Sequence, residues 1–195
     1  MSRPVSIGLR AKTGRAIAVA LGGSAASPVV ILKTEIKLVD PRVAATAQPY
    51  HQVMALPWEQ WPRAVSKSAK AIERVAAKTL AKIIKELHAK GNKVIGIGVV
   101  GSPDRDLARI GNPHIRAHAG EGILFRRVLE VGADSNRLKW QRFSDRDFDE
   151  TAAAVVGADY AKIKHDLDDL RQSVSPPWRA DEKQAAMAAW AVLHR

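Results

Sequence analysis

The sequence predicts an α/β domain built on a mixed sheet of five strands. Three patterns carry this prediction: three consecutive apolar stretches near the N-terminus, one long amphipathic helix after them, and alternating strand and helix patterns in the rest of the chain. Strands joined by turns pair antiparallel, whereas strands joined by helices pair parallel, so the sheet should be mixed. At 195 residues, we expect a single domain over residues 1–195 with a substantial core.

The first two strands form a predicted hairpin over Val5–Leu21. Val5, Ile7 and Leu9 alternate with smaller or polar residues, and an apolar run resumes after the turn residues Lys12-Thr13-Gly14. A loop over residues 22–28 leads to the third predicted strand, Val29–Ile36. We therefore expect three consecutive strands before the first helix.

A proline-rich connection follows over Val39–Pro62. Its four prolines exclude a continuous helix or a central strand. Its two tryptophans, Trp58 and Trp61, could stack on nucleic-acid bases, or they could pin the connection to the core. We favour the second interpretation.

The segment from Pro62 or Arg63 to Lys90 is the clearest predicted helix, and Gly91 is placed to end it. One face is apolar and should dock on the sheet. The opposite face carries a cationic stripe with few acidic residues nearby, which suits either nucleic-acid phosphates or solvent. The stripe consists of Lys67, Lys70, Arg74, Lys78, Lys82 and Lys85.

Lys93–Val100 is predicted as a buried central strand whose two glycines indicate close approach of another backbone. Two aspartates, Asp104 and Asp106, follow just beyond its carboxyl end, where open α/β sheets commonly bind ligands. Both could contribute to a site, and both could equally be turn residues.

The next predicted helix is His114–Glu130, with Asn112 as its N-cap and a proline at its first position. His114, His118 and Glu121 share one face, where two imidazoles and a carboxylate could bind a divalent metal ion. The alternative is a polar surface, or phosphate contacts alongside Arg116.

The C-terminal third should contain the fifth strand and three helices. Leu138–Phe143 alternates as a strand does, and Ser144–Asp147 has a capping-box pattern opening a short helix that ends at Gly157. Helices are then expected over 159–174 and over Arg179–Arg195, on either side of Pro176-Pro177.

The composition limits the classes of partner and of chemistry that this protein can have. The formal net charge is +11 and there are no cysteines, which favours polyanionic partners and excludes thiolate chemistry. The sequence opens directly on a strand pattern and contains no apolar run long enough to cross a bilayer, so we expect a cytoplasmic protein with no membrane partner.

The order of elements resembles that of the ribonuclease H-like superfamily, and within it the RuvC-like (Holliday-junction resolvase) branch. The likeness extends over nearly the whole chain and includes Leu138–Phe143, the segment 157–162 and the alanine-rich ending Arg179–Ala191. It implies a three-layer fold with a central mixed sheet ordered β-β-β-α-β-α-β-α along the chain. It also implies cleavage of nucleic acid by two metal ions held by about four carboxylates.

Most of those carboxylates have no counterpart here. Arg10 stands at the position of the first-strand aspartate, and the central-strand glutamate falls near Gly98. In the last helix Asp181 matches the first aspartate, but Gln184 replaces the second. We therefore expect no standard nuclease site, and nucleic-acid binding through Arg10, Lys12, the cationic stripe and Arg116.

Two other functions stay open. One is a metal-dependent hydrolase or nuclease with a non-standard site around His114, His118, Glu121 and Asp181, with Asp104 as a further acidic candidate and Mg or Mn as the cofactor. The other is a scaffold subunit that forms a homodimer or whose basic face docks an acidic protein partner.

Overall fold

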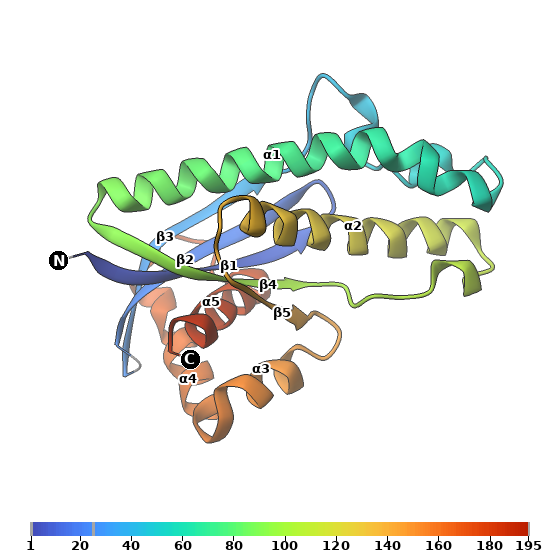
Figure 1. The fold of residues 1–195 in the computed structure, drawn as a ribbon. Helices are drawn as coiled ribbons and strands as arrows, with labels where there is room; N and C mark the ends of the chain where they lie inside the picture. The colour runs from blue at the N-terminus through green and yellow to red at the C-terminus, as the bar shows by residue number, and fades with distance from the viewer. Residues whose placement is uncertain (1, 25, 195) are drawn as a thin grey trace.

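The computed structural model describes residues 2–24 and 26–194, so Met1, Ala25 and Arg195 lie outside the described residues. Its centre is one sheet in the order β3-β2-β1-β4-β5 (Figure 1). β1 pairs antiparallel with β2 and parallel with β4, so the sheet is mixed as predicted. The strands are β1 (Arg3–Lys12), β2 (Arg15–Ser24), β3 (Ser27–Lys37), β4 (Asn92–Gly101) and β5 (Trp140–Ser144).

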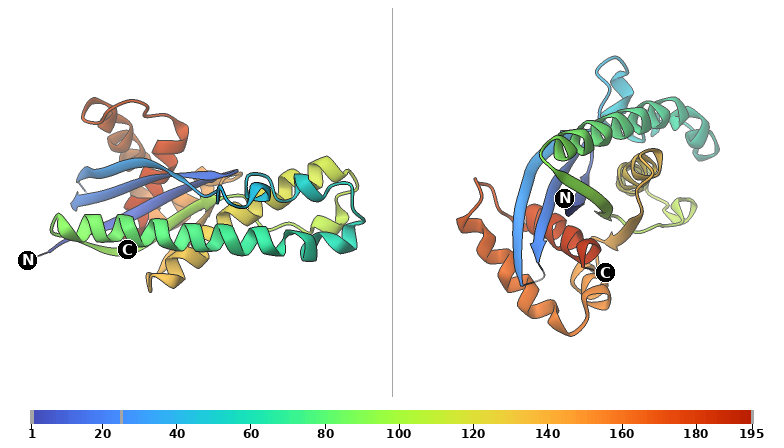
Figure 2. Two further views of the ribbon diagram at one scale, coloured as in Figure 1. Left: turned by 90° about the horizontal axis from the view of Figure 1, so that it is seen from above. Right: turned by 60° about the vertical axis from the view of Figure 1, so that its left-hand side comes forward.

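Helices cover both faces of the sheet, which gives three layers (Figure 2). α1 and α2 lie side by side on one face, while α5 packs on β1, β2 and β4 from the other, with α3 and α4 outside it. This arrangement confirms the predicted three-layer α/β architecture with a central mixed sheet of five strands. The helices are α1 (Trp61–Ala89), α2 (Pro113–Ser135), α3 (Phe148–Val156), α4 (Tyr160–Asp169) and α5 (Ala180–Leu193).

The alternation along β1 divides its side chains between the two layers. Val5, Ile7 and Leu9 belong to the core under α1 and α2. Gly8 faces α5, and a Cβ added there would overlap the Ala185 carbonyl. The next residue on that face after Gly8 is Arg10, which therefore points toward the N-terminal turn of α5.

Local signals place most helix ends. Gly91 has φ +76° and its N–H donates to the carbonyl of His88, as expected of a glycine that ends a helix. The Asn112 side chain accepts a hydrogen bond from the N–H of Ile115 (3.1 Å), which confirms it as the N-cap of α2.

Several predicted boundaries were wrong. α2 continues beyond Glu130 to Ser135, and the helix expected over 159–174 ends at Asp169. α1 begins at Trp61, before the proline, because the connection enters it through the short 3-10 turn Trp58–Gln60. The helix expected to open within 144–147 begins instead at Phe148, because the hydroxyl of Ser144 accepts from the N–H groups of Arg146 and Asp147 in the turn before the helix. Within the described residues, no helix is both long and apolar enough to cross a bilayer.

Candidate functional site

The carboxyl ends of β1 and β4 lie side by side, because the two strands are parallel and Arg10 is paired with Val100. Beside them is a pocket of about 220 Å³. Arg10 and Lys12 line it from β1, His118 from α2, Ser102 from the segment after β4, and Asp145 from the end of β5. Several residues that the sequence analysis selected separately thus meet at one edge of the sheet.

Arg10 is held by two carboxylates from different elements. Its Nη1 donates to Asp145 Oδ2 (3.2 Å) and its Nε lies 3.4 Å from Asp181 Oδ1. Nη1 also donates to the carbonyl of Ala11 (2.9 Å), and the Arg10 side chain is only 12% exposed. The guanidinium therefore joins β1 to the turn after β5 and to the first turn of α5.

Lys12 supplies a second cation to the same place. Its Nζ lies 3.2 Å from Asp181 Oδ2. Two cationic and two anionic side chains thus neutralise one another where the resemblance expects carboxylates and metal ions. Asp145 was not selected from the sequence, although its position directly after the fifth strand is the kind of place where it could have been found.

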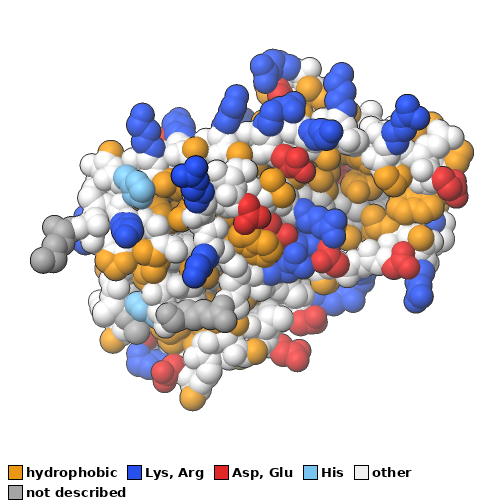
Figure 3. Space-filling view, in the orientation of Figure 1, with side chains coloured by type: hydrophobic (Ala, Val, Ile, Leu, Met, Phe, Trp, Pro, Cys, Tyr) orange, Lys and Arg blue, Asp and Glu red, His pale blue; other side chains and the backbone are white. Residues whose placement is uncertain are grey.

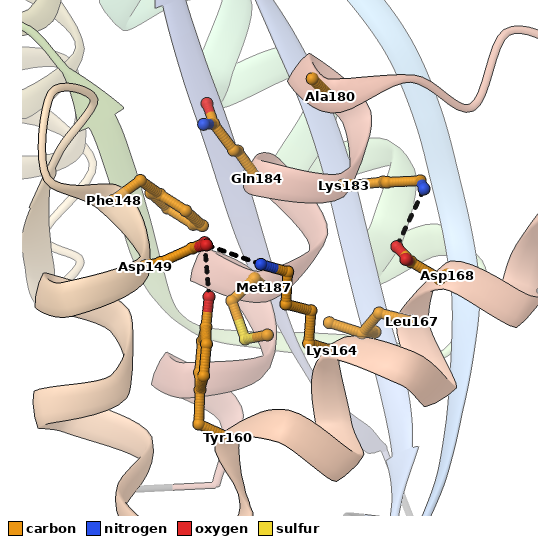
Figure 4. Close-up of a pocket in the computed structure, with 10 residues that line it drawn as sticks. All are labelled: Phe148, Asp149, Tyr160, Lys164, Leu167, Asp168, Ala180, Lys183, Gln184 and Met187. Carbon is orange, nitrogen blue, oxygen red and sulfur yellow. Dashed lines mark hydrogen bonds and ion pairs between the residues drawn. The ribbon is translucent and has the colours of Figure 1, made fainter.

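The other two positions where the resemblance expects carboxylates are occupied differently. A Cβ at Gly98 would lie 2.5 Å from the carbonyl oxygen of Ala188, so the backbone of α5 fills the space that a glutamate there would need. Gln184 lines a separate pocket of about 220 Å³ between α3, α4 and α5 (Figure 4).

That second pocket is lined by paired side chains. Asp149 accepts hydrogen bonds from the Tyr160 hydroxyl (2.7 Å) and from Lys164 Nζ (2.6 Å) across it, as Figure 4 shows. These hydrogen bonds, that from Lys164 foremost, hold the pKa of the Asp149 carboxyl below its ordinary value. Its charged groups thus already have partners within the protein.

Asp104 lies in an arginine network that joins α2 to the segment after β4 and to β5. It accepts from Arg126 Nη2 (2.5 Å), from Arg127 Nη2 (3.2 Å) and from Arg142 Nη1 (2.8 Å). Burial alone would raise the pKa of Asp104, but the three guanidinium groups outweigh it and hold that pKa below the ordinary value. Asp104 and Asp181 thus have different cationic partners and do not form one acidic site.

Asp106 and Glu182, which directly follows Asp181 in the chain, both accept backbone hydrogen bonds at helical turns. The Asp106 carboxylate accepts from the N–H of Ala108 (3.1 Å), and Glu182 accepts from the N–H of Arg179 (2.9 Å) at the start of α5.

Three histidines meet at the N-terminal part of α2. His114 and His118 project from α2 as predicted, and His51 reaches them from the connection before α1. One ring nitrogen from each lies within 4.8 Å of the others. His51 Nδ1 is 2.8 Å from Oε1 of Glu121, whose side chain is 1% exposed.

His51 was not selected from the sequence because it lies 63 residues before His114 in an irregular segment, and no spacing rule connects the two. The packing that brings it there is visible in Tyr50, whose ring lies against Gly120 of α2, where a Cβ would come within 2.8 Å of the ring. The absence of a side chain at Gly120 thus lets the connection approach the helix closely.

The two tryptophans of the connection act as predicted for a segment pinned to the core. Trp61 is buried and its Nε1 donates to the carbonyl of Leu56 (2.9 Å). The Arg116 guanidinium lies 4.8 Å from the ring centroid of Trp58, and its Nε donates to the carbonyl of Leu107 (3.0 Å). Arg116 is thus engaged in packing this corner of the fold.

The cationic stripe of α1 faces away from the sheet, and all six of its members are exposed. Lys and Arg side chains recur along the upper edge of the molecule, over α1 (Figure 3). Within residues 2–24 and 26–194, the stripe has a single ion pair, Lys82 with Glu86 at 3.9 Å. Most of its charge is therefore available to a partner.

No protein-family model and no curated protein matches this sequence. Among solved structures, the chain is similar to two of RuvC from Thermus thermophilus. One, a complex with a Holliday junction substrate, aligns with a TM-score of 0.49 and 10% identity over 96% of this chain and 90% of that one. The other aligns with a TM-score of 0.47 and 11% identity over 96% of this chain and 92% of that one.

Proposed function

We propose that this chain is a nucleic-acid-binding domain of ribonuclease H-like fold that does not cleave its ligand by the two-metal mechanism. The observation that carries the proposal is the cationic stripe on α1, which is exposed and nearly free of acidic partners. Lys67 and Lys85 are 18 residues apart, so the stripe is about 27 Å long at the helical rise of about 1.5 Å per residue. Each DNA strand carries one phosphate per about 3.4 Å of helix axis, so the stripe spans the axial rise of about eight base pairs.

The second part of the proposal concerns Arg10. Two hard divalent cations each need several oxygen ligands. Asp145 and Asp181 are paired with Arg10 and Lys12, and Gly98 has no room for a carboxylate. The side-chain cations thus stabilise the carboxylates in the way that metal ions would. Because Arg10 is paired with Asp145 and Asp181, we propose that it mainly holds these two carboxylates in place, and that contact with phosphate is secondary.

The test is fluorescence anisotropy with labelled single-stranded, duplex and four-way-junction DNA over a salt series. The wild type should bind with an affinity that falls steeply as salt rises. A triple variant, Lys70→Gln, Lys78→Gln and Lys85→Gln, should reduce the slope of log K against log salt by about 3, or about 1 for each lost phosphate contact.

The matched control is Lys93→Gln, Lys139→Gln and Lys162→Gln, which changes the net charge equally on exposed lysines outside the stripe. It should leave the slope nearly unchanged. Equal losses in both variants, or no binding by the wild type at low salt, would refute the stripe as the interface. If the wild type cleaves DNA in the presence of Mn²⁺ and Asp181→Asn does not, the proposal that this chain lacks two-metal nuclease activity is refuted.

A further inference from the structure

The three histidines at the start of α2 have the geometry of ligands around one ion. Their ring centroids are 4.4 to 5.3 Å apart, and each pair meets edge to face. Within the part of the chain that the structure describes, His114 and His118 have no hydrogen bond or ion pair through their ring nitrogens. Packing does not account for them either, because both are exposed.

A buried carboxylate stands directly behind this cluster. Glu121 Oε1 accepts from His51 Nδ1 (2.8 Å), while Glu121 Oε2 is buried and has no hydrogen-bond partner. A buried carboxylate with an unsatisfied oxygen is costly, so its position needs a positive counterpart nearby. When Nδ1 of a histidine donates to a carboxylate, Nε2 keeps the lone pair that binds metal, and the ring becomes a better ligand.

We propose that His51, His114 and His118 bind one divalent transition metal ion of the zinc class, with Glu121 as the positioning carboxylate. Imidazole nitrogens select zinc, copper or nickel over magnesium, which prefers oxygen. Zn–N bonds of about 2.0–2.1 Å bring tetrahedral ligand nitrogens to about 3.4 Å from one another. The three ring nitrogens now lie within 4.8 Å of one another, and small rotations of the exposed His114 and His118 rings would bring them to that separation.

Three protein ligands leave the fourth tetrahedral position open to water or to an anionic group. His118 also lines the pocket that contains Arg10 and Lys12, so an anion in that pocket would lie beside the ion. This site uses none of the residues of the cationic stripe and does not depend on nucleic-acid binding.

The test uses the untagged full-length chain after dialysis against a chelator. Isothermal titration with ZnCl₂ should give one ion per chain, and CoCl₂ should give the visible absorption of tetrahedral cobalt. His51→Ala and His118→Ala should each abolish both signals. Glu121→Gln should keep the stoichiometry of one and weaken the affinity about 10- to 100-fold, as expected of a group that acts through His51.

The matched control is His88→Ala, which removes an exposed histidine at the end of α1 and should bind zinc as the wild type does. Circular dichroism shows whether each variant is folded, and zinc should raise the unfolding temperature of the wild type and of His88→Ala but not that of His51→Ala or His118→Ala. No binding by the wild type, or full binding by folded His51→Ala, would overturn the site. The stripe variants should bind zinc normally, so a failure of this proposal is distinguishable from a failure of DNA binding.

Discussion

At the residue scale, many carboxylates of this protein are paired with arginines that differ widely in exposure. Arg126 is fully buried, and its three side-chain nitrogens donate to Asp104, to Glu130 and to the carbonyl of Ser102. Arg142 binds the same two carboxylates from β5. The network holds the segment after β4 against α2. Ser102 of that segment lines the pocket that contains Arg10.

Removing Arg126 should therefore be severe. Arg126→Ala leaves the buried Glu130 carboxylate with Arg142 alone, and loss of a partner from a buried pair costs about 3–5 kcal/mol of unfolding free energy. Arg127→Ala is the control, because Arg127 binds the same Asp104 but is 61% exposed, so its loss should cost less than about 1 kcal/mol. Urea unfolding measures both, and equal effects would contradict the assignment.

At the element scale, α5 owes its position to missing side chains on the strands below it. Gly8 on β1 and Gly98 on β4 face its backbone, and the Ser6 hydroxyl donates to the carbonyl of Ala189. The alanines of α5 allow this close approach. This close packing of α5 on the strands also affects the site, because it brings Asp181 within ion-pair distance of Arg10 and Lys12.

Gly98→Ala tests this contact. The new methyl group meets helix backbone, which cannot move aside as a flexible side chain would, so the variant should lose about 1–3 kcal/mol of stability. Gly111→Ala is the control, since a Cβ there meets nothing within 4 Å, and it should change stability by less than about 0.5 kcal/mol. Denaturant unfolding measures both variants. If Gly98→Ala is as stable as the wild type, the close contact between α5 and β4 at Gly98 is contradicted.

At the scale of the whole molecule, charge separates into paired and unpaired regions. The carboxylates concentrate in the arginine network, around Arg10 and along α3 and α4, while the stripe on α1 stays cationic. The net charge of +11 is therefore not spread evenly. An uneven distribution of this kind orients a polyanion toward one face.

The paired carboxylates also predict the response to acid. The hydrogen bond from Arg42 lowers the pKa of Asp40 to about 2, and the pKa values of Asp104 and Asp149 are also below the ordinary 3.8. The unfolded chain then binds more protons than the folded one below about pH 4, so stability should fall from there toward pH 2. Burial lowers the pKa of His194, which acts in the same direction at higher pH.

Urea midpoints at pH 7, pH 4 and pH 2.5 check this prediction. The wild type should lose most of its pH-dependent stability below pH 4. Arg42→Ala removes the group that lowers the pKa of Asp40, so its decline over that interval should be shallower. A midpoint that is the same at pH 4 and pH 2.5 would contradict the expected linkage.

The sequence by itself determined the order and type of nearly every element. Periodicity defined the buried face of α1, Gly91 ended that helix and Asn112 began α2, because each of these signals acts between residues that are close in the chain. The two glycines of β4 also predicted the close approach of a helix correctly.

Only the tertiary structure decided which side chains meet. Asp145 and Asp181 lie 36 residues apart in the chain and converge on Arg10, and His51 joins His114 and His118 across the whole of α1 and β4. Local propensity contains no information about such pairs, since their distance depends on how strands align and how closely helices pack. The character of the site was therefore set by the sheet register and by the glycines that let α5 and the connection approach it.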